Sequence, residues 1–394
     1  MIAATELGHA VEAARLASTR AARRPRREIA TALAAAARRW RADADLRGAL
    51  PAQAGLSAPV ITTGLDVAAA ALDADAMVEL VDRELGDERP ARPWLVAHVL
   101  ASNVPALGVP AIALTCLAGA TVVVKSGRAD RLSAPAFRRA LEAEDAELAA
   151  TVVTPYWPGG DPAAEEAVLA PADVVVATGQ DETVASLARR FTGRLVAHGE
   201  RASIVVVGRD ALEDADALAD RVARDVALHD QRGCLSPVAV YVEGDARAFA
   251  ERLVAALDAI GEAWPPGPLA AAERATHRMA IAEAEWAGAT VLGGAGGTVL
   301  LHPDPRPRPC PGRRTVWVHP LTTLADVLPP GRIECVGIAR ASVDVEVLRR
   351  LGVSRVCAPG RMQRPPLSWP RGQRAPLRAL LGLPAAPRLE VDAA

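Results

Sequence analysis

Residues 28–86 carry Leu and Ile at helical spacing among Ala, Arg and acidic residues, which predicts helices over Glu28–Arg47 and Leu65–Gly86. No side chains in this segment form a pattern that carries chemistry. We interpret it as a packing or oligomerisation segment.

The pattern changes at Trp94, where the apolar run WLVAHVL is typical of a buried strand. The uncharged stretch Val104–Val124 has the hydropathy of a membrane helix, but prolines and glycines interrupt it. We therefore predict a turn at Asn103, a buried helix over Gly108–Leu117 and a buried strand over Thr121–Lys125, and no membrane span.

Apolar strands and helical segments alternate through the rest of the chain. Strands are predicted at 151–154, 173–177, 194–197, 203–207, 238–242, 298–301, 315–318, 335–339 and 355–358. Helices are predicted at 133–149, 162–169, 181–191, 214–228, 247–260, 269–286 and 343–351. This alternation predicts an α/β fold with parallel sheets. The last 30 residues are rich in Pro and Arg and are predicted to lie on the surface as a tail.

Composition excludes several classes of protein. The chain has 394 residues, of which 51% are hydrophobic and 23% charged, so it can bury a large core. Its 47 acidic and 45 basic residues leave a net charge of -2, which argues against nucleic-acid binding. The five cysteines form no CxxC pair, which excludes a disulfide scaffold and a zinc ribbon. The N-terminus has no secretory-signal pattern, so we expect a cytoplasmic protein.

Two residue types occur once each, in one stretch of the chain. The 45 basic residues are 44 arginines and a single lysine, Lys125, and the single asparagine is Asn103. Each follows or ends a predicted strand, where α/β enzymes place site residues. Asn103 can donate a hydrogen bond to an oxyanion or serve as an ordinary turn residue. Lys125 can reach a ribose or phosphate or be a solvated strand end.

Cys234 lies in the polar segment DQRGCLSP, between a predicted helix and a predicted strand. Gly233 allows a tight turn that exposes the sulfur, and a nearby arginine favours the thiolate. Cys234 is therefore a candidate nucleophile, although a small buried hydrophobe is the alternative. That alternative fits Cys116, Cys335 and Cys357, whereas Cys310 is predicted to be an exposed loop thiol.

Thr178 and Gly179 lie at a strand–glycine–helix junction, which can direct a pyrophosphate toward the helix N-terminus. No GxGxxG motif is present in the chain. His98, His198 and His229 are candidate acid–base groups, and core or capping roles are the alternative for each. No group of residues has metal-ligand spacing.

Together these segments resemble the aldehyde dehydrogenase superfamily, and within it the acyl-CoA reductase family of LuxC type. The resemblance covers roughly 94–361 and rests on the segments HVLASNVPALGVPAIAL, TVVVKSGRAD, DVVVATGQDETV, AHGERASIVVV and DVALHDQRGCLSPVAVYVE. It implies a Rossmann-like cofactor domain over 1–195, to which 361–394 returns, and a catalytic domain over 196–360. It also implies a homo-oligomer.

The resemblance assigns roles to matching residues. Cys234 would be the nucleophile, and Asn103 and the Cys234 backbone N–H would form the oxyanion hole. The cofactor would be bound by Lys125, Ser126, Arg128, Thr178 and Gly179. The chain would then reduce a fatty acyl-CoA or acyl-carrier-protein thioester to an aldehyde through a thioacyl enzyme. An acyltransferase or acyl-protein synthetase is the partner that the family implies.

Two departures from the oxidising dehydrogenases refine this hypothesis. Those enzymes carry a glutamate that activates water, and the matching position here is Val196, which favours reduction over hydrolysis to the acid. NAD-preferring relatives often place a glutamate where this chain has Arg128, which would accept a 2′-phosphate. NADPH is therefore the expected cofactor, with NADH as the alternative.

Two other functions remain open from the sequence. An acyl-phosphate reductase, similar to glutamyl phosphate reductase, would need arginines converging on Cys234, whereas a fatty chain needs an apolar tunnel. A non-catalytic scaffold would retain the fold without the chemistry. The sequence does not identify the general acid.

Overall fold

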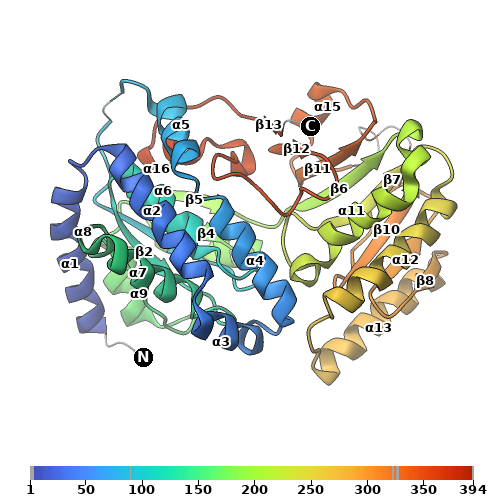
Figure 1. Ribbon diagram of the computed structural model, residues 1–394, viewed down its shortest axis with the longest axis horizontal. Coiled ribbons are helices and arrows are strands. Elements are labelled where there is room, and N and C mark those ends of the chain that lie inside the picture. Colours follow the sequence, from blue (N-terminus) through green and yellow to red (C-terminus); the bar gives the residue numbers. More distant parts are fainter. Residues whose placement is uncertain (1–3, 89, 322–323, 325–327, 393–394) are drawn as a thin grey trace.

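The computed structural model describes residues 4–88, 90–321, 324 and 328–392, and the elements below belong to that part of the chain. Two sheets stand side by side, with the N-terminal helices packed against the first and the C-terminal segment passing between the two halves (Figure 1). This arrangement places the ends of strands from both sheets around one central space.

Within the described residues, the first sheet has five parallel strands in the order β3-β2-β1-β4-β5. They are β1 (Leu95–Val99), β2 (Thr121–Lys125), β3 (Val152–Val153), β4 (Val174–Thr178) and β5 (Arg194–His198). The order reverses between β1 and β4, so the connections after these strands leave in opposite directions. A reversal of this kind opens a crevice at the carboxyl ends of the strands, where α/β proteins bind ligands.

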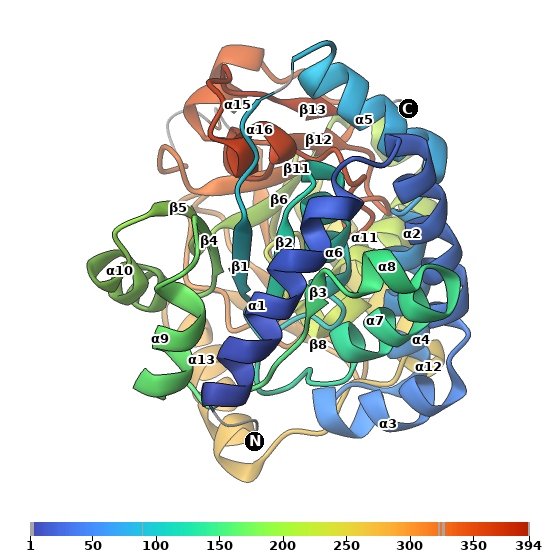
Figure 2. The ribbon, with the colours of Figure 1, turned by 90° about the vertical axis from the view of Figure 1, so that its left-hand side faces the viewer.

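Helices cover both faces of this sheet because its strands are apolar on both sides. One face packs against α1 (Ala4–Ala21) and α9 (Pro162–Leu169), and Figure 2 shows α1 crossing that face. The other packs against the N-terminal helices and α6 (Gly108–Ala118), α7 (Ser133–Glu144) and α8 (Ala146–Ala149). Helix α10 (Asp181–Arg190) joins β4 to β5.

Each of the two long N-terminal helices predicted from the sequence is divided. The elements are α2 (Arg26–Arg41), α3 (Ala44–Ala54), α4 (Ala58–Ala70) and α5 (Ala74–Leu85). Asp43 and Asp73 cause two of the breaks, because their carboxylates accept the N–H groups of Leu46 and Ala76 and so begin new helices. Short polar side chains at these positions compete successfully with helix continuation.

The second sheet of the described residues has eight strands in the order β13-β12-β11-β6-β7-β10-β9-β8. They are β6 (Ala202–Val207), β7 (Pro237–Val242), β8 (Thr290–Gly293), β9 (Thr298–Leu301), β10 (Thr315–Pro320), β11 (Ile333–Ala339), β12 (Arg355–Cys357) and β13 (Glu390–Val391). Its helices are α11 (Ala215–Ala227), α12 (Ala246–Ala263), α13 (Ala271–Trp286) and α15 (Val345–Arg350). The sequence missed β8, which pairs antiparallel with β9, and the short edge strand β13.

The prediction of a surface tail for the last 30 residues is wrong. Helix α16 (Pro376–Leu381) buries Leu377, Leu380 and Leu381 against the first half, at the spacing of one helix face. Buried Glu84 accepts the backbone N–H groups of Leu377 and Arg378, which anchors the N-terminus of α16. The chain then returns to the second sheet as β13.

Among the described residues, no helix is both long and apolar enough to cross a membrane. The same part of the chain contains no group of three or more His, Cys, Asp or Glu side chains that could hold a metal ion.

Asp225 on α11 provides a test of the buried polar core. Burial raises the pKa of its carboxyl from 3.8 to about 7, although the Gly360 N–H donates to it. The folded state therefore holds this proton more tightly than the unfolded state. We expect the free energy of unfolding to fall between about pH 4 and pH 7, by at most about 1.4 kcal/mol per pH unit.

Denaturant unfolding of the wild type and Asp225→Asn across this pH range measures the effect. The variant should lack this part of the pH dependence, whereas Asp220→Asn, at an exposed site on the same helix, should keep it. Identical pH profiles for the wild type and Asp225→Asn would contradict the expectation.

Candidate functional site

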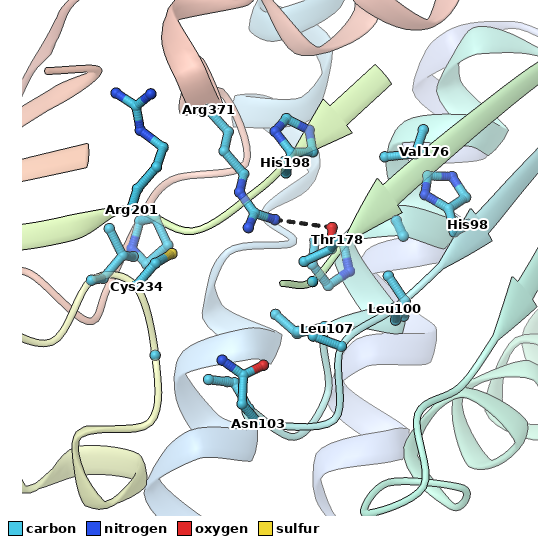
Figure 3. Close-up of a pocket in the computed structure, with 18 of the residues that line it drawn as sticks. His98, Leu100, Asn103, Leu107, Val176, Thr178, His198, Arg201, Cys234 and Arg371 are labelled. Atoms are coloured by element: carbon cyan, nitrogen blue, oxygen red, sulfur yellow. Dashed lines mark hydrogen bonds between the residues drawn. The ribbon is translucent and has the colours of Figure 1, made fainter. Parts of the chain in front are cut away.

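A cavity of about 1210 Å³ lies at the reversal point of the first sheet, and it collects the predicted site residues from both halves. Asn103 follows β1, and Lys125 and Thr178 end β2 and β4. Cys234 faces them from the segment that precedes β7 (Figure 3). Arg128 and Gly179 also line the cavity. Among the predicted site residues, Ser126 is not on the lining and is buried.

The backbone ahead of Cys234 has an unusual conformation. Three successive residues without a glycine, His229, Asp230 and Gln231, have φ values of 57°, 51° and 59°. This is the left-handed region, where Asn, Asp and His occur more often than other non-glycine residues. The tight turn predicted at Gly233 therefore lies upstream. At Gly233 a Cβ would lie 3.1 Å from the Val104 side chain, a tight contact that glycine avoids.

Buried polar contacts hold the left-handed residues in place. The Asp230 carboxylate pairs with Arg314 at 2.6 Å and also accepts the Gly267 N–H. Both charged side chains are almost fully buried, at 3% and 1% exposure. Gln231 bonds the backbone of Thr315 through both its amide nitrogen and its oxygen. Satisfied buried groups of this kind fix a single conformation, whereas unpaired ones are costly.

Cys234 is half-buried, and its carbonyl accepts a 2.6 Å hydrogen bond from the Ser203 hydroxyl. Burial raises the pKa of the Cys234 thiol, and the positive charge of Arg371 opposes this effect. Arg371 lines the same cavity and donates to the Thr178 hydroxyl at 3.3 Å (Figure 3). The site thus places a cation beside a thiol that is partly withdrawn from water.

Asn103 lies next to residues 229–234, which we call the cysteine loop. Its side-chain amide donates a 2.6 Å hydrogen bond to the carbonyl of Arg232, two residues before Cys234. The Arg232 guanidinium in turn donates to the carbonyls of Ala54 and Gly55 at the end of α3. These contacts tie the cysteine loop to the first half of the molecule. The second N–H of the Asn103 amide remains for another acceptor.

The end of the cavity near Lys125 and Arg128 is cationic. Burial lowers the pKa of Lys125, and Arg128 is exposed at the rim. The lining also holds several arginines, and its one carboxylate among the described residues is Glu200. A surface of this charge fits a molecule with several phosphates.

The first turn of α10 departs from a simple phosphate site, because Asp181 is its first residue. The Asp181 carboxylate accepts the Glu200 N–H and pairs with Arg332 at 3.0 Å. The Arg332 charge offsets the carboxylate, so the helix N-terminus is not left with an uncompensated anion.

The three candidate histidines are neutral at physiological pH. Burial lowers the pKa of His98 to about 3 and that of His229 to about 4, and it holds the pKa of His198 well below its usual value. His98 has a structural partner, the Thr115 hydroxyl at 2.8 Å. None of them is therefore an obvious proton donor. Val196, at the position of the missing glutamate, is buried on the lining.

The other four cysteines are buried or half-buried. Cys116, Cys335 and Cys357 are buried, as the sequence predicted. The prediction that Cys310 is an exposed thiol is wrong. It is half-buried at the cavity edge, donates to the Thr315 carbonyl, and has its pKa raised to about 11 by burial.

Sequence reasoning missed two parts of the site. Arg371 was one of 44 arginines in a segment interpreted as a tail, so composition gave no signal. Helix α4 was interpreted as packing only, yet it and its C-cap residue line the cavity with Gly64, Val67, Ala68 and Ala71. Their spacing of three and four residues along one helix face, all with small side chains, was a readable signal.

Comparison with known proteins identifies one matching family. A family model described as acyl-CoA reductase (LuxC) matches residues 21–380. The long-chain acyl-protein thioester reductase of Aliivibrio fischeri is 25% identical over 313 residues, covering 72% of this chain and 65% of the relative. A second such reductase, from Photobacterium leiognathi, is 28% identical and covers 64% and 57%. The chain therefore spans less than two thirds of the length of these relatives.

Solved structures of similar fold are aldehyde dehydrogenases. Aldehyde dehydrogenase 21 from Physcomitrella patens superposes with a TM-score of 0.75 and 15% identity, covering 97% of this chain and 89% of that one. A NAD-dependent aldehyde dehydrogenase from Sinorhizobium meliloti gives 0.69 and 20%, covering 90% and 79%. These matches confirm the predicted fold class.

The buried ion pair between Asp230 and Arg314 is expected to stabilise the folded protein. Replacing Arg314 with Met would leave the Asp230 carboxylate buried without its cation, which costs about 3–5 kcal/mol in comparable cases. We expect a loss of that size in the free energy of unfolding, measured by denaturant titration. Arg313→Met removes a neighbouring half-exposed pair with Glu273 and should cost less than about 1 kcal/mol. Equal losses in the two variants would contradict this reading.

Proposed function

Because the chain belongs to the acyl-CoA reductase (LuxC) family, we propose that it reduces an acyl thioester to an aldehyde through a thioester on Cys234. The observation that carries the proposal is the position of Cys234 between two unlike surfaces of one cavity. Toward α4 and α6 the lining is apolar, which suits an acyl chain. Toward Lys125 and Arg128 it is cationic, which suits a dinucleotide.

The residues support a two-step reaction. The Cys234 thiolate attacks the thioester carbonyl carbon, and the N–H groups of Asn103 and Cys234 stabilise the oxyanion. The bond to the carrier sulfur then breaks, and the carrier leaves as a thiol with a proton from solvent. Addition of a hydride to the carbonyl carbon gives a thiohemiacetal anion, which re-forms the carbonyl as the carbon–Sγ bond breaks and the cysteine leaves as the thiolate. Aldehyde is released and the cysteine is free again.

The residues present fit a nicotinamide dinucleotide, because phosphate-binding side chains and the Thr178–Gly179 turn line one end of the cavity. Such a cofactor would supply the hydride. Lys125 would bind the ribose, with Thr178 and Gly179 near the pyrophosphate, whereas Ser126 is buried off the lining. Arg128 at the rim would bind a 2′-phosphate, which favours NADPH over NADH.

The lining also favours a chain over a small anion. An acyl-phosphate reductase would need several arginines converging on Cys234, and Arg371 is one cavity arginine whose charge acts on the thiol. The Arg201 guanidinium instead pairs with Glu334 and donates to the carbonyls of Gly331 and Ile333. Arg232 is likewise bound to backbone carbonyls. We therefore retain the thioester as the substrate, carried by CoA or by an acyl carrier protein. The curated relatives are named for acyl-protein thioesters.

Replacement of Cys234 tests the proposed nucleophile. Purified protein with NADPH and acyl-CoA or acyl-carrier-protein substrates should consume NADPH at 340 nm and release aldehyde, faster than with NADH. Cys234→Ala should lose at least 10³-fold in rate, because no covalent intermediate can form. Cys116→Ala, at a buried structural cysteine, is the matched control and should retain activity.

Mass spectrometry of the wild type with acyl donor and no cofactor should find the acyl group on Cys234. A folded protein that neither acylates nor oxidises NADPH with any thioester would sink the proposed function. It would return attention to acyl phosphates or to a scaffold.

Replacement of Arg371 tests how the Cys234 thiolate is stabilised. We propose that its charge favours the Cys234 thiolate, since it opposes the effect of burial on the thiol pKa. Arg371→Gln should raise the apparent pKa of Cys234, read from the pH dependence of iodoacetamide alkylation mapped to that residue. Arg371→Lys should restore part of the shift. Arg374→Gln removes another cavity arginine, whose guanidinium bonds the Ala197 carbonyl, and should change the alkylation profile little.

A further inference from the structure

The apolar side of the cavity contains one polar side chain without a partner. His229 lines the cavity and is 6% exposed. Its Nδ1 atom is buried without a hydrogen bond, and no described residue bonds its Nε2 atom. His98, by contrast, is bonded to Thr115. An unpaired buried polar group is costly, so its persistence at a binding surface points to a partner that arrives with the ligand.

The position of the His229 ring is fixed from two sides. Its backbone is one of the left-handed residues, held by the ion pair of the adjacent Asp230. Its ring lies against Gly64 of α4, where a Cβ atom would come within 2.6 Å of Cε1. Glycine at position 64 therefore leaves the space that the imidazole occupies. A ring placed by both the loop and the opposing helix is a built feature of the cavity wall.

The surroundings of His229 define what it can bind. The side chains that line the cavity from α4 and its C-cap offer only apolar contacts: Gly64, Val67, Ala68 and Ala71. Burial lowers the pKa of His229 to about 4, so the imidazole is neutral and offers one donor and one acceptor. Nearby Arg232 donates one N–H from each terminal nitrogen to a carbonyl, and its Nε is buried without a partner. The neutral imidazole and the apolar side chains around it suit a neutral hydroxyl.

Resting on the proposed function, we infer that the preferred acyl group carries a neutral hydroxyl group that hydrogen-bonds His229, within a chamber otherwise formed by the small side chains of α4. His229 is then a specificity-determining residue, and the substrate class is a hydroxyacyl thioester rather than an unsubstituted fatty acyl thioester. The hydroxyl satisfies the imidazole on binding, while a plain chain leaves it buried and unpaired. Discrimination of this kind arises because the site loses a hydrogen bond with the wrong substrate.

The experiment compares octanoyl-CoA with its 3-, 4- and 5-hydroxy isomers, each with wild-type protein and reduced cofactor. We expect kcat/KM for at least one hydroxy isomer to exceed that for octanoyl-CoA by about tenfold, the effect of one net hydrogen bond. His229→Phe, which keeps a ring without hydrogen-bonding groups, should bring this ratio to about one. His229→Gly, which has no hydrogen-bonding side chain and tolerates the left-handed backbone, serves if the Phe variant does not fold.

Val67→Ala is the matched control, because it enlarges the same chamber and leaves His229 in place. It should change the rates for both substrates and preserve their ratio. A wild-type ratio of one or less at every hydroxyl position, or a preference that survives both His229 variants, would overturn the inference. Reduction of octanoyl-CoA in that case would leave the proposed function standing, whereas no aldehyde from any thioester would sink the proposed function itself.

Discussion

The cysteine loop depends on the buried ion pair between Asp230 and Arg314. Three residues in the left-handed region would not hold that conformation by local preference, since each is less stable there than in an ordinary turn. The pair binds the loop to the start of β10, and Arg232 binds it to the end of α3. Asn103 then donates to the same loop. One short segment thus fixes Cys234 relative to both halves of the molecule.

The cavity has two ends of different character because two kinds of element form it. The carboxyl ends of β2 and β4 supply Lys125 and Thr178, as the reversal in strand order predicts for a ligand crevice. The other end is formed mainly by α4 and α6, which present mostly small or apolar side chains. Cys234 lies on the same lining. A carbon bound to its sulfur could face the apolar surface and the cationic surface at once.

The sequence predicted the fold well where strands are buried on both faces, because a continuous apolar run has few alternative interpretations. It singled out Asn103 and Lys125 because each is the only residue of its type in the chain. It singled out Cys234 because that residue follows a glycine between a helix and a strand. It failed where the signal was shared or short. Arg371 resembles every other arginine in the chain, and β13 has only two residues. The left-handed residues ahead of Cys234 carry no glycine, so local propensity could not reveal them.

Cys234 would need to form a thiolate and then to keep a thioester from water. Arg371 bears on the first of these and Val196 on the second. Cys234 is half-buried, and Val196 places no carboxylate on the cavity lining, so water beside a thioester on Cys234 would be poorly activated. The same burial disfavours the thiolate that must form first. Arg371 offsets that cost with a fixed charge rather than with a base. A cation cannot take a proton from water, so in the proposed reaction Arg371 would assist formation of the thioester without promoting its hydrolysis. Such a site would retain the acyl group for transfer or reduction.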